Sequence, residues 1–343
     1  MSESIQKLTH VEHILKRPDS YVGPVSRVGE QYWVKEGEGF EKKTVIYAPA
    51  LLKIFDEILV NAIDRNSLYP KQVTSISVKI DREKGEISIE NNGPLGGIEV
   101  KEHEKEKIWN PELTFGHLLT STNYDDSQQR VVGGRNGYGA KLTNVYSSKF
   151  SIKIKDSENK TTYTQEWSNN MKTCGKPKMR SYAGATSSVC ITFTPDWSRF
   201  GMSAMDDHIF KIFEKRVYDA NICTTHGCKI KFQGEALPKT AFSDYARMHT
   251  KSDEVCLCMS DRWSVCVVPS EDGFEQVSFV NGICTTKGGS HVDHVAGILA
   301  SNIIDEMAKK IKLKPQQVKN SFMVFVRATL VNPTFSSQVK SEC

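Results

Sequence analysis

The chain has 343 residues, of which 38% are hydrophobic and 25% are charged, and its formal net charge is +4. This composition is typical of a soluble globular protein with room for two domains, and it excludes disorder on a large scale. The net charge is too small to indicate a nucleic-acid surface, so any DNA contact has to come from local clusters of basic residues.

Neither a membrane span nor a secretion signal is visible. No apolar run reaches the roughly 18 residues that a bilayer requires, and the N-terminal MSESIQKL has no apolar signal core. We therefore expect a cytosolic or nuclear protein with no membrane partner. The nine cysteines form neither a zinc framework nor a disulfide scaffold, and we expect them to be reduced and mostly buried.

The first strong element is a helix from Pro49 to Ser67, whose apolar residues recur with a helical period over a wide face. Two alternating segments follow, Ser75 to Ile80 and Glu86 to Asn91, and the DREKG between them predicts an antiparallel hairpin. KFSIKI, TTYTQEW and SSVCITFTP predict further strands. A second amphipathic helix is expected near residues 204–220.

After Pro238 the pattern changes to the strand-like segments SVCVVPS and EQVSFVNGI, a long helix at about residues 291–311, and the apolar strand SFMVFVRATLV. We therefore predict two α+β domains, residues 1–237 and 238–343. Because the chain stops in the polar stretch SQVKSEC with no terminating element, we expect a fragment whose second domain is truncated at its C-terminal end.

The predicted first helix carries a polar stripe. Glu57, Asn61 and Asp64 stand at i, i+4 and i+7, so all three project from nearly the same side. A solvent-facing helix edge would give the same pattern. A carboxylate one turn from a carboxamide can also hold an attacking water and a Mg²⁺ respectively, so both interpretations stay open at this point.

The segment GGRNGYGAKL, residues 133–142, is the strongest single motif. Its spacing fits neither G-x-x-x-x-G-K-[ST] nor the G-x-G-x-x-G dinucleotide fingerprint. A return to helical pattern after Gly137 places backbone N–H groups and a positive dipole end at the loop, which favours an anion. A glycine hinge is the alternative, but it leaves Arg135 and Lys141 unexplained. ENNGPLGG and TSTNYDD are weak signals alone, since each also suits an ordinary turn or polar loop.

In order and spacing, EILVNAID, ENNG and GGRNGYGAK resemble the Bergerat (GHKL) ATP-binding fold. KIFDEILVNA, LLTSTNYDD, FVNGICTTKGGSHVDHV and NPTFSSQVK are similar to the ATPase region of eukaryotic-type DNA topoisomerase II, from Thr9 to Lys340. The resemblance implies an α/β sandwich ATPase domain with an N-terminal strap, followed by a smaller α+β transducer domain.

The resemblance also implies ATP and Mg²⁺ as cofactors and assigns roles to residues. Glu57 matches the general base, Asn61 the Mg²⁺ ligand, and Lys340 the lysine that reaches the γ-phosphate from the second domain. The other residues implied to contact the nucleotide are Asp64, Asn91, Ser121, Thr122, Asn123, Gly134, Arg135, Asn136, Gly137, Tyr138, Gly139, Ala140, Lys141, Thr192 and Gln338.

The implied mechanism is a gate: ATP closes two copies into a homodimer around a DNA duplex, and hydrolysis reopens it. Strand passage would require the DNA-cleavage core of the same protein, which these residues do not resemble, and a nuclear location follows from the resemblance. Candidate DNA contacts are Lys309, Lys310, Lys312 and Lys314, although a solvated helix end explains them equally well.

The sequence departs from the family pattern at three places. Val339 replaces the threonine of Q-T-K, Ile5 stands where a strap tyrosine is frequent, and the turn after ENNG is two residues longer than N-N-G-x-G-I. Two other interpretations are a chaperone-like clamp and a mismatch-repair ATPase, which would share the ATP-binding motifs. VNGICTTKGGSHVDHV and TSTNYDD favour the topoisomerase branch over both.

Overall fold

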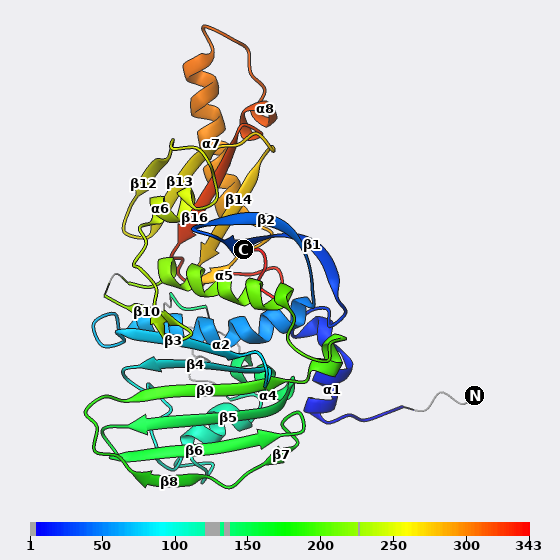
Figure 1. Ribbon diagram of the computed structural model, residues 1–343, viewed down its shortest axis with the longest axis vertical. Helices are drawn as coiled ribbons and strands as arrows, with labels where there is room; N and C mark the ends of the chain where they lie inside the picture. Colours follow the sequence, from blue (N-terminus) through cyan, green and yellow to red (C-terminus); the bar gives the residue numbers. More distant parts are fainter. Residues whose placement is uncertain (1–4, 121–130, 134–137, 226) are drawn as a thin grey trace.

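The structure is a computed structural model that describes residues 5–120, 131–133, 138–225 and 227–343. Two α+β units lie one above the other in Figure 1, and a two-stranded hairpin, β1 (Val28–Glu36) and β2 (Gly39–Tyr47), lies across their junction. In the part of the chain that is described, no helix combines the length and the apolar character that a membrane span requires.

The larger unit contains nine strands among the described residues: β3 (Ser75–Asp81), β4 (Glu86–Asn92), β5 (Ser147–Asp156), β6 (Thr161–Ser168), β7 (Thr173–Cys174), β8 (Lys178–Ser181), β9 (Ser188–Pro195), β10 (Lys229–Phe232) and β11 (Glu235–Ala236). Their order is β11-β10-β3-β4-β9-β5-β6-β7, with β8 beside β6, and among these described strands only the pairing of β10 with β3 is parallel. The unit also holds α1 (His10–Lys16), α2 (Pro49–Leu68), α3 (Asn110–Gly116), α4 (Gly139–Val145), α5 (Asp207–Cys223) and two 3-10 turns, Pro18–Ser20 and Trp197–Phe200.

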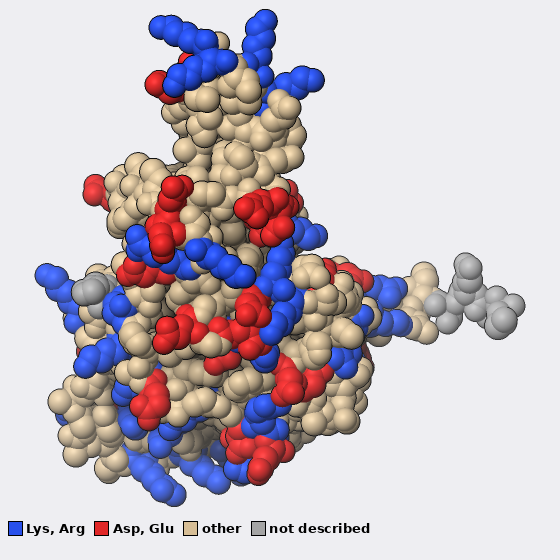
Figure 2. All heavy atoms as spheres, turned by 45° about the horizontal axis from the view of Figure 1, so that its top comes forward, with Lys and Arg blue, Asp and Glu red and all other residues tan. Residues whose placement is uncertain are grey.

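The smaller unit is built on a sheet with the order β12-β13-β16-β14-β15. Its strands are β12 (Cys256–Met259), β13 (Trp263–Pro269), β14 (Glu275–Val280), β15 (Ile283–Cys284) and β16 (Phe322–Ala328), and its helices are α6 (Phe242–Arg247), α7 (Ser290–Met307) and α8 (Pro315–Lys319). Alternate residues of β16 face opposite sides: Val324 packs with α7, whereas Phe325 packs with α6. Lysine and arginine side chains surround the free end of this unit (Figure 2).

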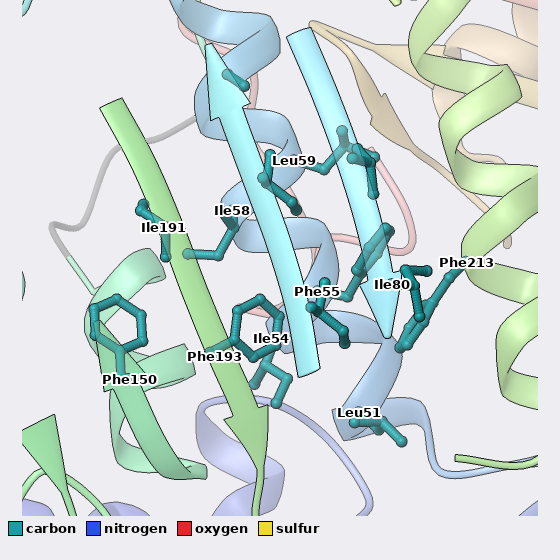
Figure 3. Packing of buried hydrophobic residues seen from close by; sticks show 14 of the residues in the cluster. Leu51, Ile54, Phe55, Ile58, Leu59, Ile80, Phe150, Ile191, Phe193 and Phe213 are labelled. Atoms are coloured by element: carbon teal, nitrogen blue, oxygen red, sulfur yellow. The ribbon is translucent and has the colours of Figure 1, made fainter. Parts of the chain in front are cut away.

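Helix α2 is fixed between the larger sheet and α5. Pro49 occupies its first turn, where a missing N–H costs nothing, and the following apolar residues face the strands (Figure 3). Phe55 stacks on Phe213 of α5 with ring centroids 4.2 Å apart, and Ile58 lies beside Ile191 of β9. Each fully buried side chain of this size stabilises the fold by about 1.5–3 kcal/mol. The polar stripe of α2 is therefore held on a rigid support.

The β1–β2 hairpin joins the two cores. Val34 and Val45 belong to the core of the larger unit, whereas Phe40 packs with Tyr245 and Phe325 in the core beneath the smaller sheet. The sequence pattern does not reveal this hairpin, because most of the β2 side chains between its two ends are charged or polar and exposed, which leaves the apolar alternation incomplete.

Most predicted elements are confirmed, with shifted ends. Helix α5 begins at Asp207 rather than near residue 204, because Asp206 accepts a bond from the Ile209 amide and caps it. Helix α7 ends at Met307 rather than near residue 311. All nine cysteines are free, but only Cys228 and Cys266 are buried and Cys174, Cys256 and Cys258 are exposed, which corrects the expectation that they are mostly buried. The division at residue 237 stays a prediction.

Candidate active site

The polar stripe of α2 is not a solvent-facing edge. Glu57 and Asp64 are only 6% and 8% exposed, and Asn61, between them, is partly exposed. Burying a carboxylate is costly unless cations or hydrogen-bond donors compensate for the lost water. The partners of these two carboxylates therefore define the site.

Two lysines surround the Glu57 carboxylate. Lys53 Nζ lies 2.5 Å from Glu57 Oε1, and Lys340 Nζ, from the far end of the chain, lies 3.8 Å from the same oxygen. Burial raises the pKa of Glu57, but the charges of Lys340 and Lys53 outweigh it, so the pKa lies below its usual range. Glu57 is therefore ionised at neutral pH and can accept a proton.

Lys53 is a site residue that the sequence analysis missed. It is 6% exposed, and burial lowers the pKa of its ammonium group although the Glu57 carboxylate raises it. A lone lysine on an apolar helix usually extends its charged end to water, which concealed this role. The signal was its position: Lys53, Glu57 and Asn61 are spaced four residues apart and share one face.

Asp64 holds the beginning of the glycine-rich segment. The Gly133 amide donates to Asp64 Oδ1 at 3.0 Å, and Lys340 Nζ donates to the Gly133 carbonyl at 3.0 Å. A Cβ at Gly133 would lie 2.6 Å from Ile283 Cδ1 and 3.2 Å from Val60 Cγ1, so only glycine fits without a shift. Residue 133 is thus in contact with α2 on one side and with the smaller unit on the other.

The end of the glycine-rich segment returns to α2. Gly139 begins α4, and a Cβ there would lie 2.2 Å from Glu57 Oε2, so any side chain at residue 139 would displace the carboxylate. Ala140 and Lys141 follow within α4. Lys141 Nζ donates to the Thr120 carbonyl at 2.5 Å, and burial lowers the pKa of Lys141 to about 8. The ring of Tyr138 packs edge-on against Tyr21 of the N-terminal region, with centroids 6.0 Å apart.

Asn91 lies at the end of β4, on the face of the sheet that α2 covers. It is 8% exposed and stands opposite Val189, while its neighbour in the alternation, Ile89, stands opposite Ile191. Its Nδ2 donates to the Asn92 carbonyl at 3.2 Å. In Figure 3, β4 lies between the strands of Ile80 and Ile191 and runs in the same direction as α2, so the end of β4 that carries Asn91 lies toward the last turns of the helix.

Thr192 is a correction. Residues of β9 alternate between the two faces, and Ile191 and Phe193 point toward α2 (Figure 3). Thr192 points the other way, where its Oγ1 is 3.0 Å from Ser88 Oγ. Its hydroxyl lies on the face of the sheet opposite Glu57 and Asn91, so we remove Thr192 from the nucleotide contacts.

Several predicted residues lie outside the described part of the chain, namely Ser121, Thr122, Asn123, Gly134, Arg135, Asn136 and Gly137. Of the second-domain residues, Lys340 is 8% exposed and enters the site, and Gln338 is half-buried two residues before it. Val339, the departure from Q-T-K, lies against Gly23, where a Cβ would be 3.2 Å from Val339 Cγ2. The replacement thus packs on the N-terminal segment.

The basic residues proposed for DNA lie far from this site. Lys309, Lys310, Lys312 and Lys314 are all exposed, at the free end of the smaller unit beyond α7 (Figures 1 and 2). Ile5 is fully exposed near the N-terminus. Neither set contributes to the geometry around Glu57.

The assembled geometry suits transfer of a group to water beside a polyanion. An ionised, buried carboxylate faces the glycine-rich segment, a partly exposed carboxamide stands one helical turn further, and three buried lysines, Lys53, Lys141 and Lys340, supply positive charge. Among side chains, oxygen ligands such as the Asn61 carboxamide are those that Mg²⁺ accepts. The arrangement therefore fits a nucleoside polyphosphate with a divalent cation.

Comparison with known proteins gives the class of this fold. A family model described as DNA gyrase B matches residues 229–342. The 43K ATPase domain of Thermus thermophilus gyrase B has the same fold, with a TM-score of 0.61 at 19% identity over 95% of this chain and 82% of that one.

Closer relatives are eukaryotic. The ATPase region of Saccharomyces cerevisiae topoisomerase II superposes with a TM-score of 0.93 and 40% identity over 98% of this chain and 89% of that one. The ATPase and transducer domains of DNA topoisomerase II from Balamuthia mandrillaris superpose with a TM-score of 0.93 and 38% identity, over 98% of this chain and 88% of that one. DNA topoisomerase 2 of Penicillium chrysogenum is 45% identical over all of this chain and 22% of its own length.

The chain therefore belongs to the eukaryotic DNA topoisomerase II family, and it corresponds to the ATPase region of those enzymes. It spans about a fifth of the length of the full relatives, 22% for the Penicillium protein and 21% for human DNA topoisomerase 2-beta. The GHKL-type fold expected from the sequence is confirmed, and the chaperone and mismatch-repair interpretations are set aside.

Proposed function

We propose that the chain is the Mg²⁺-dependent ATPase gate of a type II DNA topoisomerase. The observation that carries the proposal is the contact of Glu57 with Lys340. A buried base in the larger unit and a lysine of the smaller unit, separated by most of the chain, lie 3.8 Å apart beside Gly133 and Gly139. Such a site can bind a triphosphate and pass its state from one unit to the other.

In the proposed reaction, Glu57 accepts a proton from the water that attacks the γ-phosphorus. The low pKa of Glu57 keeps it ionised, and Lys53 holds one of its oxygens so that the other faces Gly139. Asn61 would hold Mg²⁺, which neutralises phosphate charge when bound. Lys340 and Lys141 supply further positive charge, and backbone amides of the glycine-rich segment bind phosphate oxygens.

In the proposed function, Lys340 distinguishes ATP from ADP. A ligand shifts a conformational equilibrium only if it binds one state better than the other, and a lysine that pairs with the γ-phosphate provides that difference between ATP and ADP. We propose that two copies close into a dimer with ATP, enclose a DNA duplex and reopen after hydrolysis. DNA cleavage would belong to the remaining parts of the protein, the exposed lysines beyond α7 would face DNA, and the location would be nuclear, as the resemblance implies.

The test is hydrolysis by the Glu57→Gln variant. We expect it to bind ATP with the affinity of the original chain but to hydrolyse it at least roughly 100-fold more slowly, because a general base contributes about 10²–10⁴-fold. Glu166→Gln is the matched control, since Glu166 is exposed and pairs with exposed Lys149. Normal turnover by Glu57→Gln would show that another residue is the base, and failure of the original chain to bind ATP would refute the proposed function itself.

A further inference from the structure

The turn after β4 is fixed by an arginine that the proposed mechanism does not use. Arg65, in the last turn of α2, donates from Nη2 to the carbonyl of Gly96 at 2.8 Å. Gly96 has φ +53°, and a Cβ there would lie 1.9 Å from Arg65 Nη1 and 3.0 Å from Cζ. The guanidinium is therefore in direct contact with the backbone of this turn, and a side chain at residue 96 would displace it.

The ends of the turn have backbone anchors and Leu95 packs in the core, while Gly96 is held by Arg65. The Gly93 amide donates to the Ser187 carbonyl at 2.9 Å, and the Gly97 amide donates to Glu99 Oε1 at 3.0 Å. Leu95 is 4% exposed and belongs to the core of the larger unit. Among the described residues, the bond from Arg65 is the hydrogen bond that ties Gly96 to α2.

A helix-capping role does not explain this arginine. A basic residue in the last turn of a helix ordinarily stabilises it through the helix dipole or by bonding the final carbonyls. The side-chain hydrogen bond of Arg65 instead goes to the carbonyl of Gly96, 31 residues further along the chain. Burial lowers the pKa of Arg65, while Tyr69, Glu99 and Asp64 raise it, so the cation is desolvated to hold the turn rather than extended into water.

The position of Arg65 along α2 relates it to one end of the site. Glu57 and Arg65 are eight residues apart, which is about 12 Å along a helix and comparable to the length of an extended nucleotide. Asp64, next to Arg65, holds Gly133 of the glycine-rich segment, and Asn91 ends the strand that leads into the turn. With the terminal phosphate beside Glu57, the base of a nucleotide would lie at the level of Asn91, Asp64 and Arg65.

We propose that Arg65 is a positioning residue that fixes the turn at residues 93–97 as the wall of the base-binding end of the site, and thereby sets nucleotide affinity without taking part in hydrolysis. The inference rests on the proposed function, because it requires ATP in this orientation. It also gives a role to the two-residue extension of the turn: a long guanidinium side chain spans the distance from α2 to Gly96.

The experiment compares Arg65→Met and Arg65→Lys with the original chain by calorimetric titration with ADP and by steady-state hydrolysis of ATP. For Arg65→Met we expect the Kd of ADP and the KM of ATP to rise by about tenfold or more, with kcat at saturating ATP within about twofold. Arg65→Lys keeps the charge and one donor, so we expect a rise of about threefold. Gly96→Ala, which changes the other side of the contact, should raise the same two quantities and leave kcat unchanged.

The outcomes separate this inference from the proposed function. If the original chain binds ADP and the folded Arg65 variants bind it equally well, Arg65 only supports the fold and the inference is wrong. If kcat falls while KM is constant, Arg65 acts on the reaction rather than on the base-binding end, which also overturns it. Should Arg65→Met fail to melt cooperatively, Arg65→Lys carries the test. An original chain that binds no ADP would instead refute the proposed function.

Discussion

Two buried charge clusters include consecutive residues of α2, Asp56 and Glu57. They differ in how completely their carboxylates are hydrogen-bonded, and this difference distinguishes a structural cluster from a catalytic one. The closed cluster consists of Asp56, Lys215, Arg216, Asp219 and Tyr245, and the open cluster of Lys53, Glu57 and Lys340. In the closed cluster, Arg216 Nε and Nη2 donate to Asp56 Oδ1 at 2.8 and 2.5 Å, and Nη1 donates to Asp219 Oδ2 at 3.0 Å. Lys215 Nζ and the Tyr245 hydroxyl donate to Asp219 Oδ1 at 2.7 and 2.6 Å.

The carboxylate of the open cluster has fewer hydrogen bonds. Two cations approach Glu57 Oε1, but among the described residues no donor reaches that oxygen with hydrogen-bond geometry. Asp219 accepts three hydrogen bonds across its two oxygens, whereas both ion-pair partners of Glu57 approach Oε1, so Glu57 keeps more capacity to bond to a water. Two carboxylates on elements that pack together thus acquire different roles from their partners. The closed cluster joins α5, α2 and α6, and the open cluster joins α2 to the segment that ends the chain.

The largest expected effect is on stability, from breaking the closed cluster. Arg216→Met should lower the free energy of unfolding by about 3–5 kcal/mol, because it leaves the buried Asp219 carboxylate with one cation fewer. The measurement is urea denaturation at neutral pH. Arg247→Met is the matched control, since the Arg247–Asp244 pair is exposed on both sides and its loss should change stability by less than about 1 kcal/mol. Equally small losses of unfolding free energy in both variants would show that the closed cluster does not stabilise the fold more than an exposed ion pair does.

A smaller effect, on the pH dependence of hydrolysis, is expected from the open cluster. Lys53→Met removes one of the charges that lower the pKa of Glu57, so the raising effect of burial is opposed less and the pKa increases. Since the base must be ionised, the acid limb of the kcat profile should move to higher pH and turnover at neutral pH should fall by roughly three- to tenfold. Lys53→Arg, which keeps the charge, should leave the limb nearer its original position. An unmoved limb in Lys53→Met would mean that Lys53 does not tune Glu57.

The sequence predicted those parts of the site whose signal is local. The stripe of Glu57, Asn61 and Asp64 follows from helical spacing, and the glycine-rich segment follows from composition. Thr192 could have been excluded from the sequence, because Val189, Ile191 and Phe193 form the apolar face of its strand and place Thr192 on the other. Arg65 could not have been recognised, since only the fold brings Gly96 to it.

The long-range contacts required the structure or the family resemblance. The backbone of Gly139 lies so close to Glu57 Oε2 that a side chain there would displace the carboxylate. The spacing of residues in the sequence does not reveal this contact. The contact of Lys340 with Glu57 spans most of the chain and depends on how the two units pack through the β1–β2 hairpin, an element that the sequence pattern did not reveal. Tertiary packing decided these features, and local propensity carried little information about them.

The central claim is that Lys340 reports the γ-phosphate to the smaller unit and so controls closure. The most direct measurement is the mass in solution by sedimentation, with Mg²⁺ and either no nucleotide, ADP or a non-hydrolysable ATP analogue, for the original chain and for Lys340→Gln. We predict that the original chain dimerises with the analogue alone, and that Lys340→Gln binds the analogue but stays monomeric. Dimerisation of Lys340→Gln at the same analogue concentration, or of the original chain equally with ADP, would contradict the claim.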